Sequence, residues 1–389
     1  MIYDFIVFGG TGQQGSICAR DLLEQGYKVL LFGRNPEKIQ KLLKKHNNAS
    51  FCAVDLRNQQ EIAKVIRSSR ASVVINCAEL IFNVAIMRAC LETGKCVTDL
   101  GGLHTITREQ FKLDNAFRKK GILCLTGCGS TPGISNVMAS YAADKLDSID
   151  TIMLGFAWDS NIKQFVVPYS LPSIFKEFRE LPVVMHNGKF VKSNRMHCQG
   201  TFDFETVGKQ TAYCIVHSEV YTFAKYFKDR GLKNVNYMAG FPEHSLRVIH
   251  MLMDLGFDSE KDVSIQNIKI RPLDFTIRVL KRLPIPNGYD EVENVWVNVF
   301  GKKAGITKEI RMECIVKTVK GWEDAGSNIN TGRTIAVMSA MLKEGFIGGT
   351  GVQAPEAVVP HAPFFAELKK RGMNVFENGK RIKIDKTAV

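Results

Sequence analysis

The segment YDFIVFGGTGQQG, residues 3–15, decides the fold of this chain. Its first half is short, apolar and ended by glycine, which predicts a buried strand. Gly10, Gly12 and Gly15 then satisfy the pattern GxGxxG, and a helix is predicted over residues 14–25. Glycines let a backbone turn tightly and bring its N–H groups close to a diphosphate, whose charge also gains from a helix start. The segment therefore predicts a dinucleotide-binding unit.

Short apolar strands and helices alternate from this segment to about residue 126. Further strands are predicted at 27–32, 50–54, 71–76, 95–98 and 122–126. Helices are predicted between them, at 36–46, 58–68, 82–92 and 107–119. This alternation is typical of an α/β fold with a Rossmann-type, doubly wound parallel sheet.

The sequence pattern changes after about residue 130. Longer strands, several of which alternate apolar and polar residues, are predicted at 151–157, 210–216, 264–270, 294–300 and 310–319. Helices are predicted near 133–146, 220–230, 242–255 and 333–345. The alternation indicates a sheet with one face covered, so a second, mixed α/β domain is expected.

The composition excludes wholesale disorder, since 45% of the 389 residues are hydrophobic and 23% are charged. The formal charge of +13 suits an anionic ligand, a nucleic acid or an acidic membrane surface. The basic residues are dispersed and form no nucleic-acid-binding signature, so no nucleic-acid partner is predicted. The sequence contains no apolar run long enough to span a membrane and no recognisable signal peptide. We therefore expect a cytoplasmic protein without a membrane partner. The ten cysteines form no CxxC pair, so reduced thiols and no metal site are expected.

The residues after the second strand select between the two nicotinamide dinucleotides. An NAD site usually has an acidic residue there that binds the ribose 2′-OH, whereas this chain has Gly33-Arg34-Asn35. The Arg34 guanidinium can present a planar fork to a 2′-phosphate, so NADP is favoured over NAD. The alternative is that Arg34 is a solvated cation at a helix start.

More cofactor contacts are expected at the carboxyl edge of the sheet. Asp55 follows the third strand and either contacts the adenine side or caps the next helix. Cys77 and Ala78 follow the fourth strand, at the expected crevice. The predicted cofactor contacts are therefore Gly9, Gly10, Thr11, Gly12, Gln13, Gln14, Gly15, Arg34, Asn35, Asp55, Cys77 and Ala78.

The pair Tyr141 and Lys145 matches the YxxxK pattern of short-chain dehydrogenases. In that family the pair follows the fifth strand, whereas here it follows the sixth. Tyr141 also continues an apolar helical stripe, so a role in the core is predicted. An atypical short-chain dehydrogenase remains an alternative reading.

Four sequence motifs between residue 9 and about residue 372 occur in the same order as in a known family. They are the glycine loop, GCGSTPGISN at 127–136, His217-Ser218-Glu219 followed by Thr222, and a tail with Thr331-Gly332, Met341-Leu342, Gly351-Val352 and Ala354-Pro355-Glu356. Together they resemble the saccharopine dehydrogenase (saccharopine reductase) family, which includes carboxynorspermidine dehydrogenase-like enzymes. Saccharopine reductases carry Asp where this chain has Thr131 before Pro132-Gly133, so the substrate is left open.

The resemblance implies two domains. Residues 1–130 and 340–389 would form the NADP-binding domain, and residues 131–339 an inserted domain for substrate binding and dimerisation. It also implies NADP-linked oxidation of a secondary-amine C–N bond in an amino-acid-like small molecule, or the reverse reductive condensation, by a homodimer. A protein that binds NADP as a sensor without turnover is the alternative.

This reaction needs a base for the amine proton and for the water that splits the imine. Asp99 ends a strand at the crevice edge and is either catalytic or a loop carboxylate. His217 and Glu219 alternate at the end of a strand-like run, so they would share a face as an acid/base pair or as a structural pair. Cations available for substrate carboxylates are Arg271, Arg278 and Lys163.

Overall fold

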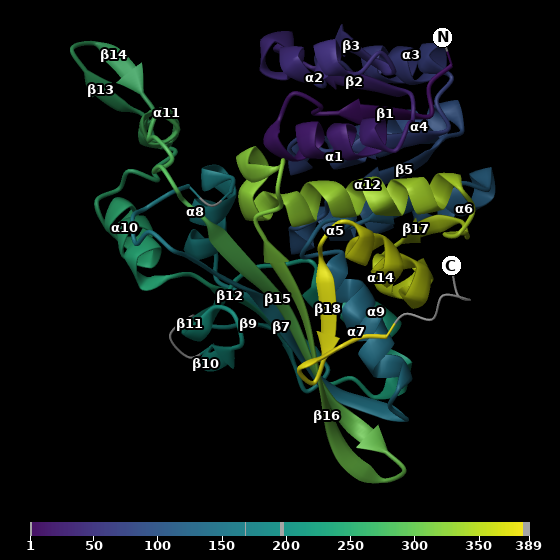
Figure 1. Cartoon of the computed structure of the whole chain (residues 1–389), viewed down its shortest axis with the longest axis vertical. Coiled ribbons are helices and arrows are strands. Elements are labelled where there is room, and N and C mark those ends of the chain that lie inside the picture. Colours follow the sequence, from purple (N-terminus) through teal and green to yellow (C-terminus); the bar gives the residue numbers. More distant parts are fainter. Residues whose placement is uncertain (1, 168, 195–197, 384–389) are drawn as a thin grey trace.

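A seven-stranded parallel sheet forms one half of the protein (Figure 1) in this computed structural model, which describes residues 2–167, 169–194 and 198–383. Its strand order is β17-β6-β5-β4-β1-β2-β3. The strands are β1 (Phe5–Phe8), β2 (Val29–Gly33), β3 (Ala49–Ala53), β4 (Val73–Asn76), β5 (Cys96–Asp99), β6 (Leu123–Thr126) and β17 (Gly351–Gln353). The order reverses at β1, which places a crevice at the carboxyl ends of β1 and β4. The predicted Rossmann-type sheet is confirmed.

Helices cover both faces of this sheet because its strands are apolar on both sides. Phe5 and Val7 pack toward α1 and α12, while Ile6 and Phe8 pack toward α3 and α4. The helices are α1 (Gln13–Glu24), η1 (Pro36–Ile39), α2 (Gln40–Lys45), α3 (Gln59–Ser69), η2 (Leu80–Phe82), α4 (Asn83–Thr93), α5 (His104–Phe111), α6 (Asp114–Lys120) and α12 (Ile329–Lys343). The single helix predicted over 107–119 is wrong, because tight turns at Lys112 and Leu113 separate α5 from α6.

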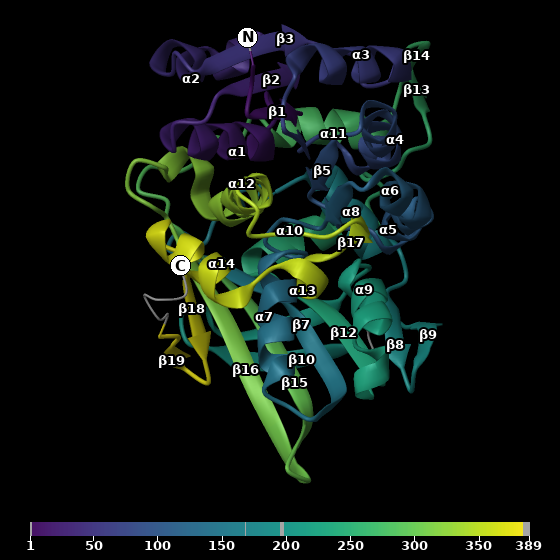
Figure 2. The same cartoon turned by 90° about the vertical axis from the view of Figure 1, so that its right-hand side faces the viewer.

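A ten-stranded mixed sheet forms the other half (Figure 2). Its main path is β10-β11-β12-β7-β15-β16-β18-β19. Off this path β8 pairs with β12 and β9 pairs with β8, and only β12 and β7 pair in parallel. The strands are β7 (Ser148–Ser160), β8 (Val183–His186), β9 (Lys189–Lys192), β10 (Gln199–Phe204), β11 (Gly208–Cys214), β12 (Asn234–Gly240), β15 (Glu291–Lys303), β16 (Ile306–Lys317), β18 (Asn374–Glu377) and β19 (Lys380–Arg381). The predicted second, mixed α/β domain is confirmed.

The helices of this half are α7 (Ile134–Asp144), α8 (Leu171–Arg179), α9 (Glu219–Tyr226), η4 (Lys228–Arg230), α10 (Glu243–Asp254), α11 (Pro272–Leu280) and η5 (Glu323–Asn328). The strand predicted at 264–270 is wrong. It is a hairpin of β13 (Val263–Ile265) and β14 (Ile268–Ile270), because Gln266 and Asn267 both adopt positive φ. Cys198 and Cys214 form a disulfide, although reduced thiols were expected.

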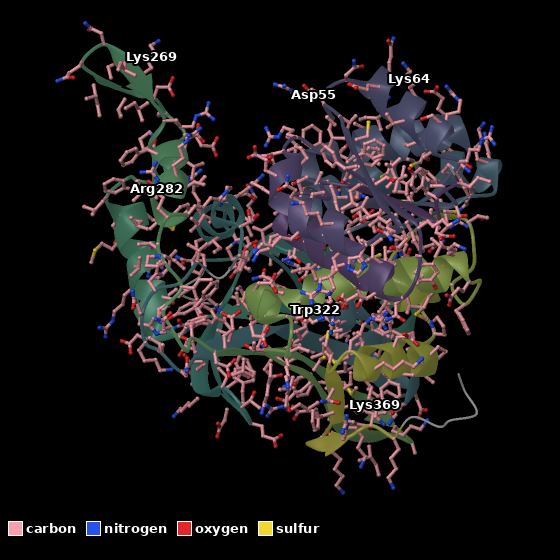
Figure 3. All side chains as sticks on the ribbon, turned by 45° about the horizontal axis from the view of Figure 1, so that its top comes forward. Asp55, Lys64, Lys269, Arg282, Trp322 and Lys369 are labelled. Atoms are coloured by element: carbon pink, nitrogen blue, oxygen red, sulfur yellow. A yellow bond between two sulfur atoms is a disulfide. The ribbon has the colours of Figure 1, made fainter. Side chains whose placement is uncertain are left out.

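The chain returns to the first sheet after α12. β17 pairs with β6, and α13 (Pro355–Val358) and α14 (His361–Lys370) follow it. A buried ion pair holds this tail in place, since Arg371 binds Asp21 of α1 at 2.9 Å and Arg333 of α12 binds the same carboxylate at 3.3 Å. The Arg333 guanidinium also stacks on the ring of Trp322, which is labelled in Figure 3, as does the guanidinium of Arg20 of α1. β18 then joins the second sheet, so the tail contacts both halves.

Candidate functional site

The glycine loop after β1 has the geometry of a diphosphate cradle. Gly9 has a φ of +73°, and a Cβ there would lie 2.6 Å from the Ala78 nitrogen. A Cβ on Gly15 would lie 2.2 Å from the Gly9 carbonyl oxygen, so α1 can approach β1 this closely only with glycine. Gly12 caps α1 and has no side chain to accept bonds from the first-turn N–H groups. These donors therefore suit an anionic group.

The three residues of this loop that are not glycine, Thr11, Gln13 and Gln14, surround the cradle with side chains. Thr11 packs under Gly33, where a Cβ would meet its hydroxyl at 2.4 Å. Gln13 is exposed, whereas the Gln14 amide donates to Asn328 at 2.9 Å and keeps a buried carbonyl oxygen without a partner among the described residues. An NADP diphosphate and its ribose would be held by the loop from Gly10 to Gly15, and the residues present fit that group.

Arg34 and Asp55 lie beyond β2 and β3, and Asp55 is at the top of the first sheet in Figure 3. Arg34 is exposed and forms no hydrogen bond or ion pair within the described residues. Arg57 binds the Asp55 carboxylate at 2.6 Å, and this bond lowers the Asp55 pKa to about 2. Asn35 caps η1 through a 2.9 Å bond from the Glu37 nitrogen. Because Arg57 already neutralises Asp55, Arg34 stays available to an anion.

A buried polar network runs along the crevice edge and includes Asp99. One carboxylate oxygen accepts from the Gly101 nitrogen at 2.7 Å and from Thr126 at 2.9 Å, and the other accepts from Gln110 at 2.6 Å. Asp99 is 1% exposed, and burial raises its pKa. The network continues through Asn83 to Asn76, the residue before Cys77 and Ala78, both of which are half-buried. Asp99 is thus placed to hold the loop after β5.

The predicted pair His217 and Glu219 is in contact. The Nδ1 atom of His217 bonds the Glu219 carboxylate, and the His217 ring stacks on Tyr237 with centroids 3.7 Å apart and planes 6° apart. The expected strand ends earlier, since Glu219 is the first residue of α9. The contact therefore comes from a turn and not from one strand face. Among the described residues, the His217 ring forms its hydrogen bond through Nδ1, and none is formed to Nε2.

Glu219 links this pair to the first sheet. Its other oxygen accepts from Ser135 of α7 at 3.2 Å, and the neighbouring Asn136 donates to Glu356 at 2.7 Å. Glu356 follows β17, so it lies at the carboxyl edge of the first sheet. Burial raises the Glu356 pKa to about 7, and the nearby Glu219 charge adds to the rise. The buried carboxyl groups of Glu219 and Glu356 are thus linked through the neighbouring residues Ser135 and Asn136.

The loop after β6 joins the two sheets. Thr131 and Tyr237 share a hydrogen bond of 2.7 Å between their hydroxyls, which connects this loop to the ring under His217. A Cβ on Gly133 would lie 1.9 Å from the Gly129 carbonyl oxygen, so the loop closes on itself only with glycine. Ser130 donates to Glu293 of β15 at 3.4 Å, and burial raises the Glu293 pKa to about 7.

Sequence reasoning missed Glu356 and Glu293 as site residues. A signal existed for Glu356, since it follows a short apolar segment at the end of a strand, as Asp99 does. No local sequence pattern indicated Glu293, because its hydrogen-bond partner Ser130 is 163 residues away. Asn136 accepts a hydrogen bond from the Gly133 nitrogen at 2.8 Å and thus caps α7.

The YxxxK pair, Tyr141 and Lys145, contacts β18 and not the His217–Glu219 pair. The Tyr141 hydroxyl and the Lys145 ammonium both bind Glu377 of β18, and Tyr141 packs edge-on against Phe365. The predicted core role of Tyr141 is confirmed.

The cations proposed for the substrate are not brought together. Lys163 binds Asp159, whereas Arg271 and Arg278 are exposed at α11. Within the described residues, no group of three His, Cys, Asp or Glu side chains could hold a metal ion, and no helix could span a membrane.

Comparison with known proteins places both halves in one group. A family model described as the saccharopine dehydrogenase NADP binding domain matches residues 5–125, and one described as the saccharopine dehydrogenase C-terminal domain matches residues 129–373. Carboxynorspermidine synthase of Vibrio cholerae is 28% identical over 303 residues, which are 70% of each chain. Carboxyaminopropylagmatine dehydrogenase of Synechocystis is 22% identical over 386 residues, which cover 95% of this chain and 96% of that protein.

A solved structure shares the fold over nearly the whole chain. Apo saccharopine dehydrogenase (L-Glu forming) of Saccharomyces cerevisiae superposes with a TM-score of 0.73. It is 15% identical, and the match covers 98% of this chain and 100% of that one. The shared architecture includes the Rossmann-type sheet and the second mixed sheet.

Proposed function

Because the chain belongs to the saccharopine dehydrogenase family of NADP-binding oxidoreductases, we propose that it oxidises the secondary-amine C–N bond of an amino-acid-derived substrate, or runs the reverse reductive condensation. The observation that carries the proposal is the His217–Glu219 contact, tied through Ser135 and Asn136 to the carboxyl edge of the NADP-binding sheet. An acid/base pair at that edge suits a reaction that moves both a hydride and a proton.

Bound NADP supplies the hydride acceptor for oxidation, or the hydride donor for the reverse reaction. The protein has to move protons. Glu219 holds the Nδ1 side of His217, which leaves Nε2 to take the proton from the substrate amine as the C–N bond becomes an imine. After this proton is released to solvent, the same nitrogen takes a proton from the water that attacks the imine carbon and passes it to the leaving nitrogen, so that a carbonyl compound and a primary amine result. Tyr237 stacks under the ring and fixes its plane.

We assign Asp99 a positioning role in this proposal. Of the two roles expected for Asp99, catalytic residue or loop carboxylate, we favour the second, since donors from Gly101, Thr126 and Gln110 occupy its oxygens. It would hold the loop at 100–103 beside the cofactor. Arg34 would bind the 2′-phosphate of NADP, and Cys77 and Ala78 would border the nicotinamide side of the crevice.

The relatives' names support a substrate with an amino-acid end and a basic chain. Carboxynorspermidine and carboxyaminopropylagmatine are both carboxylated amines with a cationic chain. Half-buried Glu293, near buried Glu291, could face such a chain, since opposite charges attract strongly where water is scarce. We further propose a cytoplasmic homodimer that acts on a small molecule, without nucleic-acid or membrane partners.

The test is an NADPH oxidation assay. The purified chain is given NADPH with pairs of an amino-acid semialdehyde and a diamine, and nicotinamide absorbance is followed. The proposal expects turnover that requires both the carbonyl compound and the amine, and that falls in His217→Gln while NADPH binding persists. Binding of NADPH without turnover on a wide panel would favour the sensor instead.

A further inference from the structure

The segment from residue 251 to residue 285, which we call the arm, carries an unusual share of exposed apolar side chains. It comprises the end of α10, the β13–β14 hairpin and α11 with its flanking turns, and it projects from one side of the molecule (Figure 1). Ten of the 17 large apolar side chains that are exposed in the described residues lie in it, including Met251, Leu255, Val263, Ile265, Ile268 and Phe275. Patches of this kind mark interaction surfaces.

The β13–β14 hairpin lacks a covering surface among the described residues of this chain. β13 and β14 form a separate two-stranded sheet with three residue pairs, and neither strand pairs with another strand among the described residues. Ile268 is 63% exposed and Ile265 is 54% exposed. An isolated two-stranded hairpin is marginally stable in water, so this one needs a surface to cover it.

The charge of the arm selects the kind of partner. The arm contains six basic and five acidic residues, although the whole chain carries a net charge of +13. A membrane or nucleic-acid surface would call for a clear excess of cations, whereas the acidic residues of the arm nearly balance its basic ones, two of which, Lys269 and Arg282, are labelled in Figure 3. A nearly neutral apolar patch is instead where two copies of a strongly basic chain can meet with least repulsion.

The number of exposed residues in the arm is also large enough for a stable protein–protein interface. Of its 35 residues, 25 are exposed, and a stable interface uses about 20–30 residues on each side. Two copies related by a twofold axis would bring the same surface together, and would place equivalent hairpin strands antiparallel to each other. Their unpaired edges and exposed isoleucines would then be covered at once.

We infer that the arm is the surface on which a second copy of this chain docks. The inference rests on the homodimer included in the proposed function, and it does not depend on the proposed chemistry. Because NADPH binding and solution mass are measured separately, failure of one can be told from failure of the other.

The test is the solution mass of the full chain, measured by light scattering during size-exclusion chromatography at micromolar concentration. We expect twice the 43.5 kDa of one chain. The double variant Ile265→Asp/Ile268→Asp should elute with the mass of one chain, while its circular dichroism and NADPH binding stay unchanged. The matched control is Ile306→Asp at the β15–β16 turn, where Ile306 is 62% exposed, and it should keep the double mass.

If the double variant fails to fold, Phe275→Lys on α11 replaces it, since that side chain is 52% exposed and its loss should not disturb the fold. Three results would overturn the inference. They are a native chain with the mass of one copy, arm variants that keep the double mass, and a control that loses it together with them. A one-copy chain that binds anionic vesicles through the arm would likewise count against a second copy as the occupant.

Discussion

Replacement of Glu356 by Gln should change how stability depends on pH. Burial holds the Glu356 pKa at about 7 against an ordinary value of 4.5. The folded protein therefore binds this proton more tightly than the unfolded chain, so the stabilisation is complete below pH 4.5 and is lost as pH rises through about 7. At about 1.4 kcal/mol for each pKa unit, the loss amounts to about 3 kcal/mol. Glu356→Gln removes the titration and with it the loss.

The assay is urea unfolding of the native chain and the variant at about pH 4.5 and about pH 8. The stability of Glu356→Gln relative to the native chain should rise by about 3 kcal/mol between those conditions. The matched control is the variant Glu92→Gln, whose side chain is exposed. Its free energy of unfolding should stay within about 0.5 kcal/mol of that of the native chain at both pH values. A relative change for Glu356→Gln below about 1 kcal/mol would refute the burial argument.

The other predictions concern the cofactor and the acid/base pair. Gly15→Ala should weaken NADPH binding at least about 100-fold in calorimetry, because its Cβ would meet Gly9, whereas Gly348→Ala has open space and should bind normally. Arg34→Asp should reduce the preference for NADPH over NADH by about 10- to 150-fold, the value of a charged hydrogen bond, and equal preference in both chains would contradict it. Glu219→Gln should lower kcat by about 100-fold or more while KM for NADPH is unchanged; a change confined to KM would argue for a structural role.

The first sheet could be predicted from the sequence because parallel strands buried on both faces are short, continuous apolar runs. All six predicted strands of residues 3–126 appear, and the turn after the first has the expected glycine geometry. The hairpin at 263–270 was missed as one strand, although Asn267 offered the signal of a two-residue turn with positive φ.

The candidate site could be predicted only in part. His217 and Glu219 were found because they are two residues apart, although a turn brings them together and not a strand. Asn136 and Glu356 are 220 residues apart, and no local pattern records a contact of that range. Asp99 was placed correctly at the sheet edge, but the donors that surround it come from three other segments.

The most direct measurement of the proposed chemistry uses NADPH that carries deuterium at the reactive nicotinamide carbon. The purified chain is incubated with this cofactor, an amino-acid semialdehyde and a diamine, and the product is analysed by mass spectrometry with fragmentation. The account predicts a secondary amine that carries one deuterium on the carbon next to nitrogen, and no labelled product from His217→Gln. A labelled alcohol in place of the amine, or NADPH that binds and is never consumed, would contradict it.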